Sequence, residues 1–214
     1  MDINLKGKKV IITAAATWVK IDNVRVISNI ASGETGILFA EKLNKLGARV
    51  TLLLGPVDRV LLDNKIKVIN FKFFEELKYL LVKELKLKQY DIAVHSAAVS
   101  DYQPVAVISK KIASGLKNLR INLKPTPKLI DIFKKIQPDI FLVGFKFEPD
   151  TSRFQLVKES RKQIRASGAD LVVANTIAQK RYSAYLVDRG GYRGPFSTKA
   201  AMVSGLLKLF KRII

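Results

Sequence analysis

Short apolar stretches rich in β-branched residues alternate with amphipathic stretches along most of the chain. The first, residues 8–14, reads Lys-Lys-Val-Ile-Ile-Thr-Ala, which is typical of a strand buried on both faces of a parallel sheet. Similar runs predict further strands at residues 49–54, 66–71, 91–96, 139–145, 170–174 and 184–187. Helices are predicted at residues 33–46, 73–87, 127–136, 152–167 and 197–211. This order predicts an α/β fold with a Rossmann-like, mostly parallel sheet and helices on both faces.

The length of 214 residues suits one domain, and we expect residues 1–214 to form it. No apolar run reaches the roughly 18 residues that a membrane span requires. The first six residues lack the charged and then apolar plan of a signal peptide. The lack of cysteine excludes disulfides and a cysteine nucleophile, and a single histidine excludes a multi-histidine metal site. We therefore expect a cytoplasmic protein with no membrane partner and no metal-binding cluster.

Lysine and arginine outnumber aspartate and glutamate by 38 to 18, which gives a net charge of +20. Such a charge attracts anions, so nucleic acid, an anionic membrane surface and polyphosphates are candidate partners. The basic residues are spread from Lys6 to Arg212 with few aromatic residues among them, which argues against nucleic acid. Solvated surface lysines are an equally good explanation of the charge. A basic α/β nucleic-acid-binding protein is kept as the alternative function.

An unusually long connection separates the first predicted strand from the first helix. Such connections ordinarily have about two to six residues, and this one has roughly twenty. Five apolar residues argue against disorder, namely Ile21, Val24, Val26, Ile27 and Ile30. Long ordered connections in compact domains are usually functional. We interpret this one as an active-site loop.

The end of this loop offers two kinds of candidate site. Ser32, as a possible N-cap, and the glycines Gly33 and Gly36 mark a helix start whose free N–H groups would accept a phosphate closely. Ordinary capping is the alternative. Arg25 could hold a carboxylate or phosphate, and Asn29 could donate to a carbonyl oxygen that gains negative charge. Both side chains could equally tie the loop to itself.

Ligands of open parallel sheets bind beyond the carboxyl ends of the strands. Four stretches that follow predicted strands should therefore line one crevice: residues 13–36, 96–104, 144–148 and those from Asn175 onward. A nicotinamide dehydrogenase would need Gly-x-Gly-x-x-Gly directly after the first strand. Residues 13–18 contain no glycine, which disfavours redox chemistry.

Residues 105–124 have no helical period and are rich in lysine and β-branched residues. Apolar residues alternate with polar ones over residues 119–123, as in an exposed strand, so we interpret the segment as an excursion from the sheet. Lys110 and Lys111 could reach a polyphosphate from there or form a solvated surface pair. His95, just before a predicted turn, is interpreted as a structural histidine rather than a catalytic base.

Taken together, these stretches resemble the phosphopantothenate–cysteine ligase (phosphopantothenoylcysteine synthetase) family over nearly the whole chain. The most specific motif is I-D-x-V-R-x-I-x-N-x-x-S-G at residues 21–33, followed by A-A-V-x-D-Y at residues 97–102. Further matching stretches are residues 9–14, 111–112, 123–130, 143–145 and 170–175.

The resemblance implies a ligase that joins 4′-phosphopantothenate to cysteine in coenzyme A biosynthesis. The carboxylate would attack the α-phosphorus of a nucleoside triphosphate, CTP rather than ATP in most bacterial-type members, with Mg²⁺ assisting and pyrophosphate leaving. The amine of cysteine would then attack the acyl-nucleotide. Such a reaction needs no protein nucleophile, only positioning and charge neutralisation. The resemblance also implies a homodimer in which the excursion around Lys111 covers the partner's site. The flavin-dependent decarboxylase often fused ahead of such a domain is not expected here.

The resemblance also implies roles for individual residues. Asn29 matches the asparagine that handles the acyl-nucleotide, with Arg25 as its companion on the acyl and phosphate side. Lys111 matches the lysine needed to form the acyl-nucleotide. The implied nucleotide-contacting positions are Ala97, Asp101, Lys111, Pro127, Lys128, Leu129, Ile130, Phe145 and Lys162. The candidate phosphate-binding positions remain those of the helix start, Ser32, Gly33 and Gly36, which also match the family.

The sequence departs from the family pattern at several of these stretches. Ala15-Ala16-Thr17 stands where the family usually has Gly-Gly-Thr, and Val19 stands where it has glutamate. Ala166 replaces a second lysine on the later helix, and Ala113-Ser114 replaces basic residues after the Lys111 position. Methyl groups in place of glycine hydrogens hinder close approach of a ligand to the backbone. These departures bear on nucleotide choice and rate more than on the class of reaction.

Overall fold

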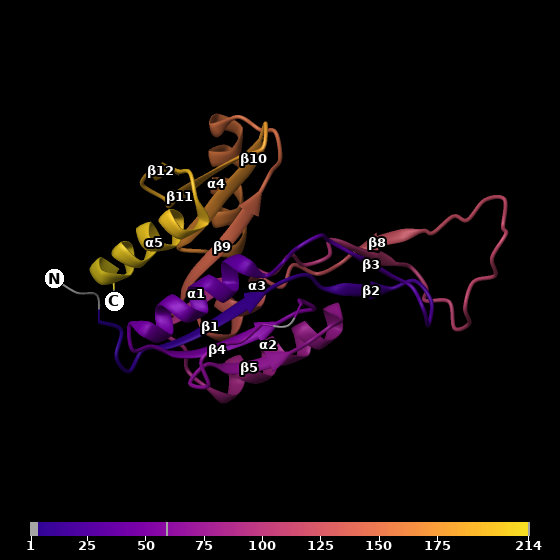
Figure 1. Cartoon of the computed structure of the whole chain (residues 1–214), viewed down its shortest axis with the longest axis horizontal. Helices are drawn as coiled ribbons and strands as arrows, with labels where there is room; N and C mark the ends of the chain where they lie inside the picture. The colour runs from indigo at the N-terminus through magenta and orange to yellow at the C-terminus, as the bar shows by residue number, and fades with distance from the viewer. Residues whose placement is uncertain (1–3, 59, 214) are drawn as a thin grey trace.

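The computed structural model describes residues 4–58 and 60–213 (Figure 1). Met1 to Ile3, which belong to the stretch examined for a signal peptide, lie outside the described residues. The strands of the main sheet are β1 (Lys9–Ala14), β4 (Arg49–Leu54), β5 (Lys67–Asn70), β6 (Ile92–His95), β9 (Phe141–Phe147), β10 (Leu171–Ala178), β11 (Arg181–Val187) and β12 (Tyr192–Phe196). The helices are α1 (Glu34–Lys45), α2 (Phe74–Leu87), α3 (Asp131–Ile136), α4 (Arg153–Ser167) and α5 (Lys199–Ile213).

The main sheet has the strand order β12-β11-β10-β9-β6-β1-β4-β5. All neighbours from β10 to β5 are parallel, and β11 and β12 extend the sheet as antiparallel strands. The chain therefore reverses its direction of winding between β1 and β6, which is where ligands bind in doubly wound sheets. The predicted α/β class and mostly parallel sheet are confirmed.

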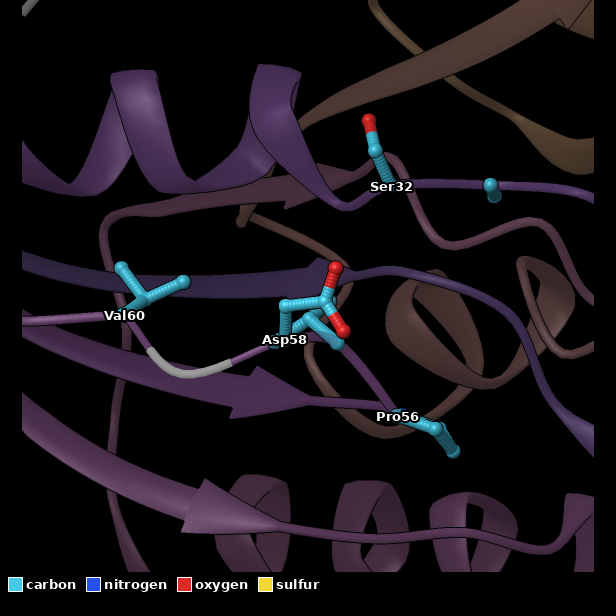
Figure 2. Close-up of a pocket in the computed structure, with 6 residues that line it drawn as sticks. Ser32, Pro56, Asp58 and Val60 are labelled. Carbon is cyan, nitrogen blue, oxygen red and sulfur yellow. The ribbon is translucent and has the colours of Figure 1, made fainter.

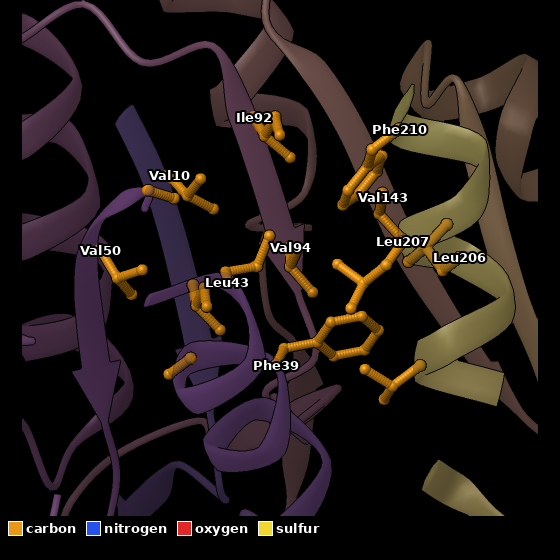
Figure 3. Packing of buried hydrophobic residues seen from close by; sticks show 14 of the residues in the cluster. Val10, Phe39, Leu43, Val50, Ile92, Val94, Val143, Leu206, Leu207 and Phe210 are labelled. Carbon is orange, nitrogen blue, oxygen red and sulfur yellow. The ribbon is translucent and has the colours of Figure 1, made fainter. Parts of the chain in front are cut away.

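Two hydrophobic layers hold the helices on the two faces of this sheet. Alternate residues of β1 point to opposite sides, so Val10 and Ile12 pack with α1 and α5, whereas Ile11 packs with α2, α3 and α4. Figure 3 shows the first layer, in which Phe39 and Leu43 of α1 and the side chains of α5 pack over the same face of the strands. Near-complete burial on both faces explains why these strands read as continuous apolar runs.

A second region, which we call the arm, extends away from the sheet in Figure 1. The arm comprises residues 17–30 and 99–126. Its strands β2 (Trp18–Lys20) and β3 (Val26–Ser28) form one antiparallel pair, and β7 (Tyr102–Pro104) and β8 (Leu123–Pro125) form another. The predicted excursion from the sheet is therefore confirmed. The long loop between β1 and α1 forms the other part of the arm.

Several boundaries differ from the sequence predictions. Gly33, with φ of 72°, is the N-cap of α1 instead of Ser32, whose hydroxyl accepts the Glu34 N–H at 3.4 Å. The last helix is capped by Thr198 instead of Ser197, because the Thr198 hydroxyl accepts the Ala201 N–H at 3.0 Å. A cap is chosen by backbone dihedrals, which neighbouring serine and threonine residues do not reveal.

Three further predictions need correction. The helix predicted from Pro127 begins only at Asp131, because Leu129 and Ile130 form a turn with their side chains buried. Residues 119–122 do not form a strand, although apolar and polar residues alternate there. The strand β8 begins only at Leu123. The sequence analysis also missed β2, β3, β7 and β12, which have few buried side chains to produce a periodic pattern.

Candidate active site

The carboxyl ends of β1 and β6 are joined by a buried polar network. The Thr17 side chain accepts the Ser100 N–H at 2.9 Å and contacts the Ser100 hydroxyl at 3.1 Å. The backbone N–H of Ala98 donates to the Ala15 carbonyl at 2.8 Å, and the Thr17 N–H donates to the Ala98 carbonyl at 3.3 Å. The segments that follow the two strands thus continue side by side beyond the sheet.

Asn29 closes this arrangement from the arm. Its side-chain amide donates to the carbonyl oxygens of Ala98 and Val99, both at 3.2 Å. The Asn29 side chain itself is exposed. The long loop and the segment after β6, which carry the two most specific sequence motifs, therefore meet at the point where the winding reverses.

Asp101 and the segment before α3 form the next part of the site. The Lys128 ammonium lies 2.6 Å from the Asp101 carboxylate, and both side chains are exposed. The Thr126 hydroxyl donates to the Ser100 carbonyl at 2.6 Å, which fixes the turn. Pro127 is exposed, whereas the side chains of Leu129 and Ile130 are buried in the α2–α3–α4 layer. A ligand in the crevice could reach the backbone of these two residues but not their side chains.

The start of α1 is packed too tightly for larger residues. A Cβ atom on Gly36 would lie 2.7 Å from the Ser96 hydroxyl and would also overlap Ala14. One on Gly33 would lie 3.0 Å from Val57. Ala15 has φ of 69°, a conformation that favours glycine, although it is alanine in this chain. The backbone at Ala15 thus has a conformation that glycine adopts more readily than alanine.

An open hollow lies beside this helix start. It is lined by Ala31, Ser32, Pro56, Val57, Asp58 and Val60. Figure 2 shows Ser32 on the α1 side of the hollow and Pro56, Asp58 and Val60 on the segment that follows β4. The hydroxyl of Ser32 and the carboxylate of Asp58 are the polar side-chain groups of its lining.

Phe145 lies in the last part of β9, two strands from β1. Its ring packs edge-on against Phe39 of α1 with 6.2 Å between centroids, and its carbonyl accepts a hydrogen bond from Gln163 at 3.3 Å. At the end of the neighbouring β10, the side-chain oxygens of Asn175 and Thr176 are buried, and no described residue donates to them. Lys162 lies on the exposed surface of α4 and pairs with Glu159 at 2.7 Å.

Arg25 and Lys111 are in the arm and not in the crevice of their own chain. The Arg25 guanidinium binds the Asp22 carboxylate at 2.6 Å and the Ile112 carbonyl at 3.2 and 3.3 Å. Lys111 is exposed in the segment between β7 and β8, which forms the outer end of the arm (Figure 1). Asp22, which holds this corner together, was missed in the sequence analysis. An aspartate that opens a turn, at Asp22-Asn23-Val24, is the signal that could have found it.

His95 is buried at the end of β6. Its Nδ1 lies 2.8 Å from the Thr13 hydroxyl, and its ring lies 5.3 Å from that of Phe133. Burial lowers the pKa of His95 to about 4, so the imidazole is neutral near pH 7. These contacts agree with a structural role.

Comparisons with known proteins identify the family. Residues 5–190 match the family model described as DNA/pantothenate metabolism flavoprotein C-terminal domain. The chain belongs to this family. A relative from Thermococcus kodakarensis, the coenzyme A biosynthesis bifunctional protein CoaBC, is 43% identical to this family member over 175 residues. That alignment covers 81% of the chain and 42% of the relative, so the chain spans less than half of the relative's length.

Solved structures agree with this membership. The crystal structure of the DNA/pantothenate metabolism flavoprotein from Streptococcus pneumoniae is 26% identical and has a TM-score of 0.87, covering 97% of this chain and all of that one. A Cab2 mutant in complex with phosphopantothenate-cysteine shares the fold at 17% identity, with a TM-score of 0.77 over 96% of this chain and 87% of that one. In the described residues, no helix is both long and apolar enough to span a membrane.

Proposed function

We propose that residues 1–214 form a phosphopantothenate–cysteine ligase domain that acts in the cytoplasm in coenzyme A biosynthesis. The observation that carries this proposal is the hydrogen-bonded contact of Asn29 with the backbone of Ala98 and Val99. It brings the two most specific motifs together where the winding of the sheet reverses, which is the ligand-binding point of such folds.

In this proposal the reaction has two steps. The carboxylate of 4′-phosphopantothenate attacks the α-phosphorus of the nucleotide, and pyrophosphate leaves. The amine of cysteine then attacks the acyl carbon, and the nucleoside monophosphate leaves. Asn29 turns its amide from the two backbone carbonyls toward the acyl oxygen as negative charge develops there. Arg25 and Lys111 offset the charge of the acyl-phosphate and triphosphate groups.

The nucleotide binds across the carboxyl ends of β6 and β9 in this proposal. Asp101, Lys128 and the backbone of residues 127–130 line one side, and Phe145 lies on the other. The backbone of Ala97 also lines the nucleotide site. The Lys162 ammonium separates from Glu159 to reach the phosphates. The free N–H groups at Ser32, Gly33 and Gly36 receive a phosphate at the start of α1.

CTP is the proposed nucleotide, with ATP as the competing choice. Mg²⁺, if bound with the nucleotide, would supply positive charge that offsets the triphosphate. In residues 4–58 and 60–213 no group of three or more His, Asp or Glu side chains could hold an ion. Magnesium bound to phosphates needs only one or two carboxylates, and Asp101 is the one that the proposed nucleotide site offers.

We further propose a homodimer in which each arm covers the partner's site. The arm exposes many large apolar side chains: Val24, Val26, Ile30, Tyr102, Val105, Val107, Ile108, Leu116, Leu119 and Leu123. An exposed apolar surface of this extent is typical of a protein interface. The position of Lys111 at the outer end of the arm suits a role in the partner's site.

The test is a ligation assay with CTP and ATP in parallel. Pyrophosphate release should require phosphopantothenate and a nucleotide together, and product should form only when cysteine is added. Asn29→Ala should slow the cysteine step by roughly 10²- to 10³-fold, the usual cost of losing one such donor. Unchanged product formation in both Asn29→Ala and Lys111→Ala would refute the site. Tight polynucleotide binding at physiological salt without ligation would establish the alternative function.

A further inference from the structure

The segment that carries Lys111 is attached to the β2–β3 turn at two points. The Ile108 N–H donates to the Ile21 carbonyl at 3.0 Å. Four residues later, the Ile112 N–H donates to the Asp22 carboxylate, also at 3.0 Å. Lys111 lies between these points and is exposed. The lysine is therefore held on a short bridge whose two ends are fixed.

Asp22 is the centre of the second attachment. Its side chain is 1% exposed. One carboxylate oxygen accepts the N–H groups of Val24 and Arg25 at 2.8 and 2.7 Å, and the other accepts the Ile112 N–H. These hydrogen bonds, with that of Ile112 the largest contribution, hold the pKa of Asp22 well below its usual range. A buried carboxylate with this many donors is fixed in one orientation.

Arg25 completes the attachment from the other side. One terminal nitrogen donates both to Asp22, at 2.6 Å, and to the Ile112 carbonyl, at 3.2 Å. The second terminal nitrogen donates to the same carbonyl at 3.3 Å. Both backbone polar groups of Ile112, the residue after Lys111, are thus held by the Asp22–Arg25 pair. The Ile112 side chain is buried as well, which limits rotation of the segment further.

We propose that Asp22 is a positioning residue: it fixes residues 108–112 in the one arrangement that presents Lys111 to the reacting phosphates. This inference rests on the proposed ligase function and adds to it a residue that touches no substrate. Arg25, which also pairs with Asp22, is assigned to the acyl-phosphate group, whereas Lys111 acts on the triphosphate. In pyrophosphate release the contribution of Asp22 therefore passes through Lys111, so removing Asp22 matters for that step only while the lysine is present.

The experiment is a double-mutant cycle on the first half-reaction, pyrophosphate release without cysteine. Asp22→Asn keeps the shape of the side chain but places an N–H donor or a neutral oxygen against Ile112 and Arg25. Asp22→Asn should lower kcat roughly 10- to 100-fold, the usual cost of displacing a catalytic group by about 1 Å. The KM for the nucleotide should change less. In a Lys111→Ala background, adding Asp22→Asn should change kcat less than about twofold.

Asp188→Asn is the matched control. Asp188 accepts the N–H groups of Gly190 and Gly191 at 2.9 and 2.7 Å and lies 3.5 Å from Arg193, so it repeats the chemistry of Asp22 in the β11–β12 turn. Its replacement should leave kcat within about twofold of the wild-type value, because the turn lies outside the proposed site.

Hydrogen exchange separates a local change from unfolding. In Asp22→Asn, the Ile112 amide should exchange faster while the amides of the main sheet keep their protection. Two results would overturn the inference while leaving the ligase proposal intact. One is a wild-type kcat in Asp22→Asn. The other is a double variant whose loss of kcat equals the product of the losses caused by Asp22→Asn and Lys111→Ala alone. Loss of sheet protection in Asp22→Asn would also overturn it, since Asp22 would then stabilise the whole fold. A wild-type protein that releases no pyrophosphate would instead refute the ligase proposal.

Discussion

In the main sheet, alternate side chains of the central strands pack under helices on opposite faces, whereas the four short strands of the arm form two separate ribbons. The core of the sheet includes fully buried residues such as Ile11, Ile12 and Leu43. The arm leaves large apolar side chains in solvent and is held by hydrogen bonds around Asp22 and Asn29. Two-stranded ribbons are marginally stable on their own. The sheet is thus stabilised by burial, while the arm depends on polar contacts and, in our proposal, on a partner.

The largest expected effect is on the free energy of unfolding, and it is seen by comparing one substitution in the main sheet layer with one in the arm. Leu43→Ala empties a fully buried position between α1 and the sheet, and should lower the free energy of unfolding by about 3–5 kcal/mol. Leu116→Ala, in the arm, removes a side chain that is 55% exposed in the single chain, and should cost less than about 0.5 kcal/mol at dilutions where any dimer is dissociated. Urea denaturation measures both. Equal losses for the two variants would contradict the distinction between the regions.

The same distinction explains what the sequence could predict. The strands and helices of the sheet were found because burial imposes a period on residues such as Phe74, Leu77 and Leu81. A helical period over residues 33–46 favours Ile37, Ala40 and Leu43 as the buried face of α1, yet Ile37 is only partly buried and Phe39 is fully buried, because the helix is rotated slightly from that pattern. In the arm, burial sets no pattern, so β2, β3 and the true extent of β8 could not be derived.

For the candidate site, motif resemblance was more informative than periodicity. It selected Asn29 and Asp101, which the structure brings to the segments that follow β1 and β6, and their roles stay predictions. It could not indicate that Leu129 and Ile130 turn their side chains into the core, since that depends on where α3 begins. It also gave no role to Asp22, whose partner at Ile112 is 90 residues away in the chain.

A pH experiment gives the next largest effect and concerns the sheet alone. His95 has a pKa of about 4 in the folded protein and 6.5 as its ordinary value. Between these values the unfolded chain binds a proton that the folded chain does not, so stability falls as the pH drops below 6.5. By pH 4.5 the loss should be about 2–3 kcal/mol. The stability that Glu84 contributes is lost only below pH 4.5, since its pKa is lowered to about 2.

Denaturation curves near pH 7 and pH 4.5 measure this loss, and His95→Gln is the control. The variant should be less stable near pH 7, because a packed ring is removed, yet its stability should change little between the two pH values. A variant that keeps the full wild-type pH dependence would show that another group is responsible.

A smaller effect is expected where the loop from the arm enters α1. Gly36→Ala places a methyl group against Ser96 and Ala14 and should cost about 1–3 kcal/mol through overpacking. If the helix start also binds a phosphate, the KM of one phosphate-bearing substrate should rise as well. Gly191→Ala is the control, because its added Cβ meets no atom within 4 Å. Equal stability of the two variants would mean that the start of α1 is looser than described.

The central claim, that the arm of one chain completes the site of another, is tested most directly by mixing two inactive variants. Asn29→Ala and Lys111→Ala chains are unfolded together, refolded and assayed for ligation. If Lys111 acts in the partner's site, half of the dimers are mixed and each has one intact site, so about a quarter of the wild-type rate should return. If both residues act within one chain, every site in the mixture keeps a defect. Activity no higher than that of the separate variants would then contradict the account.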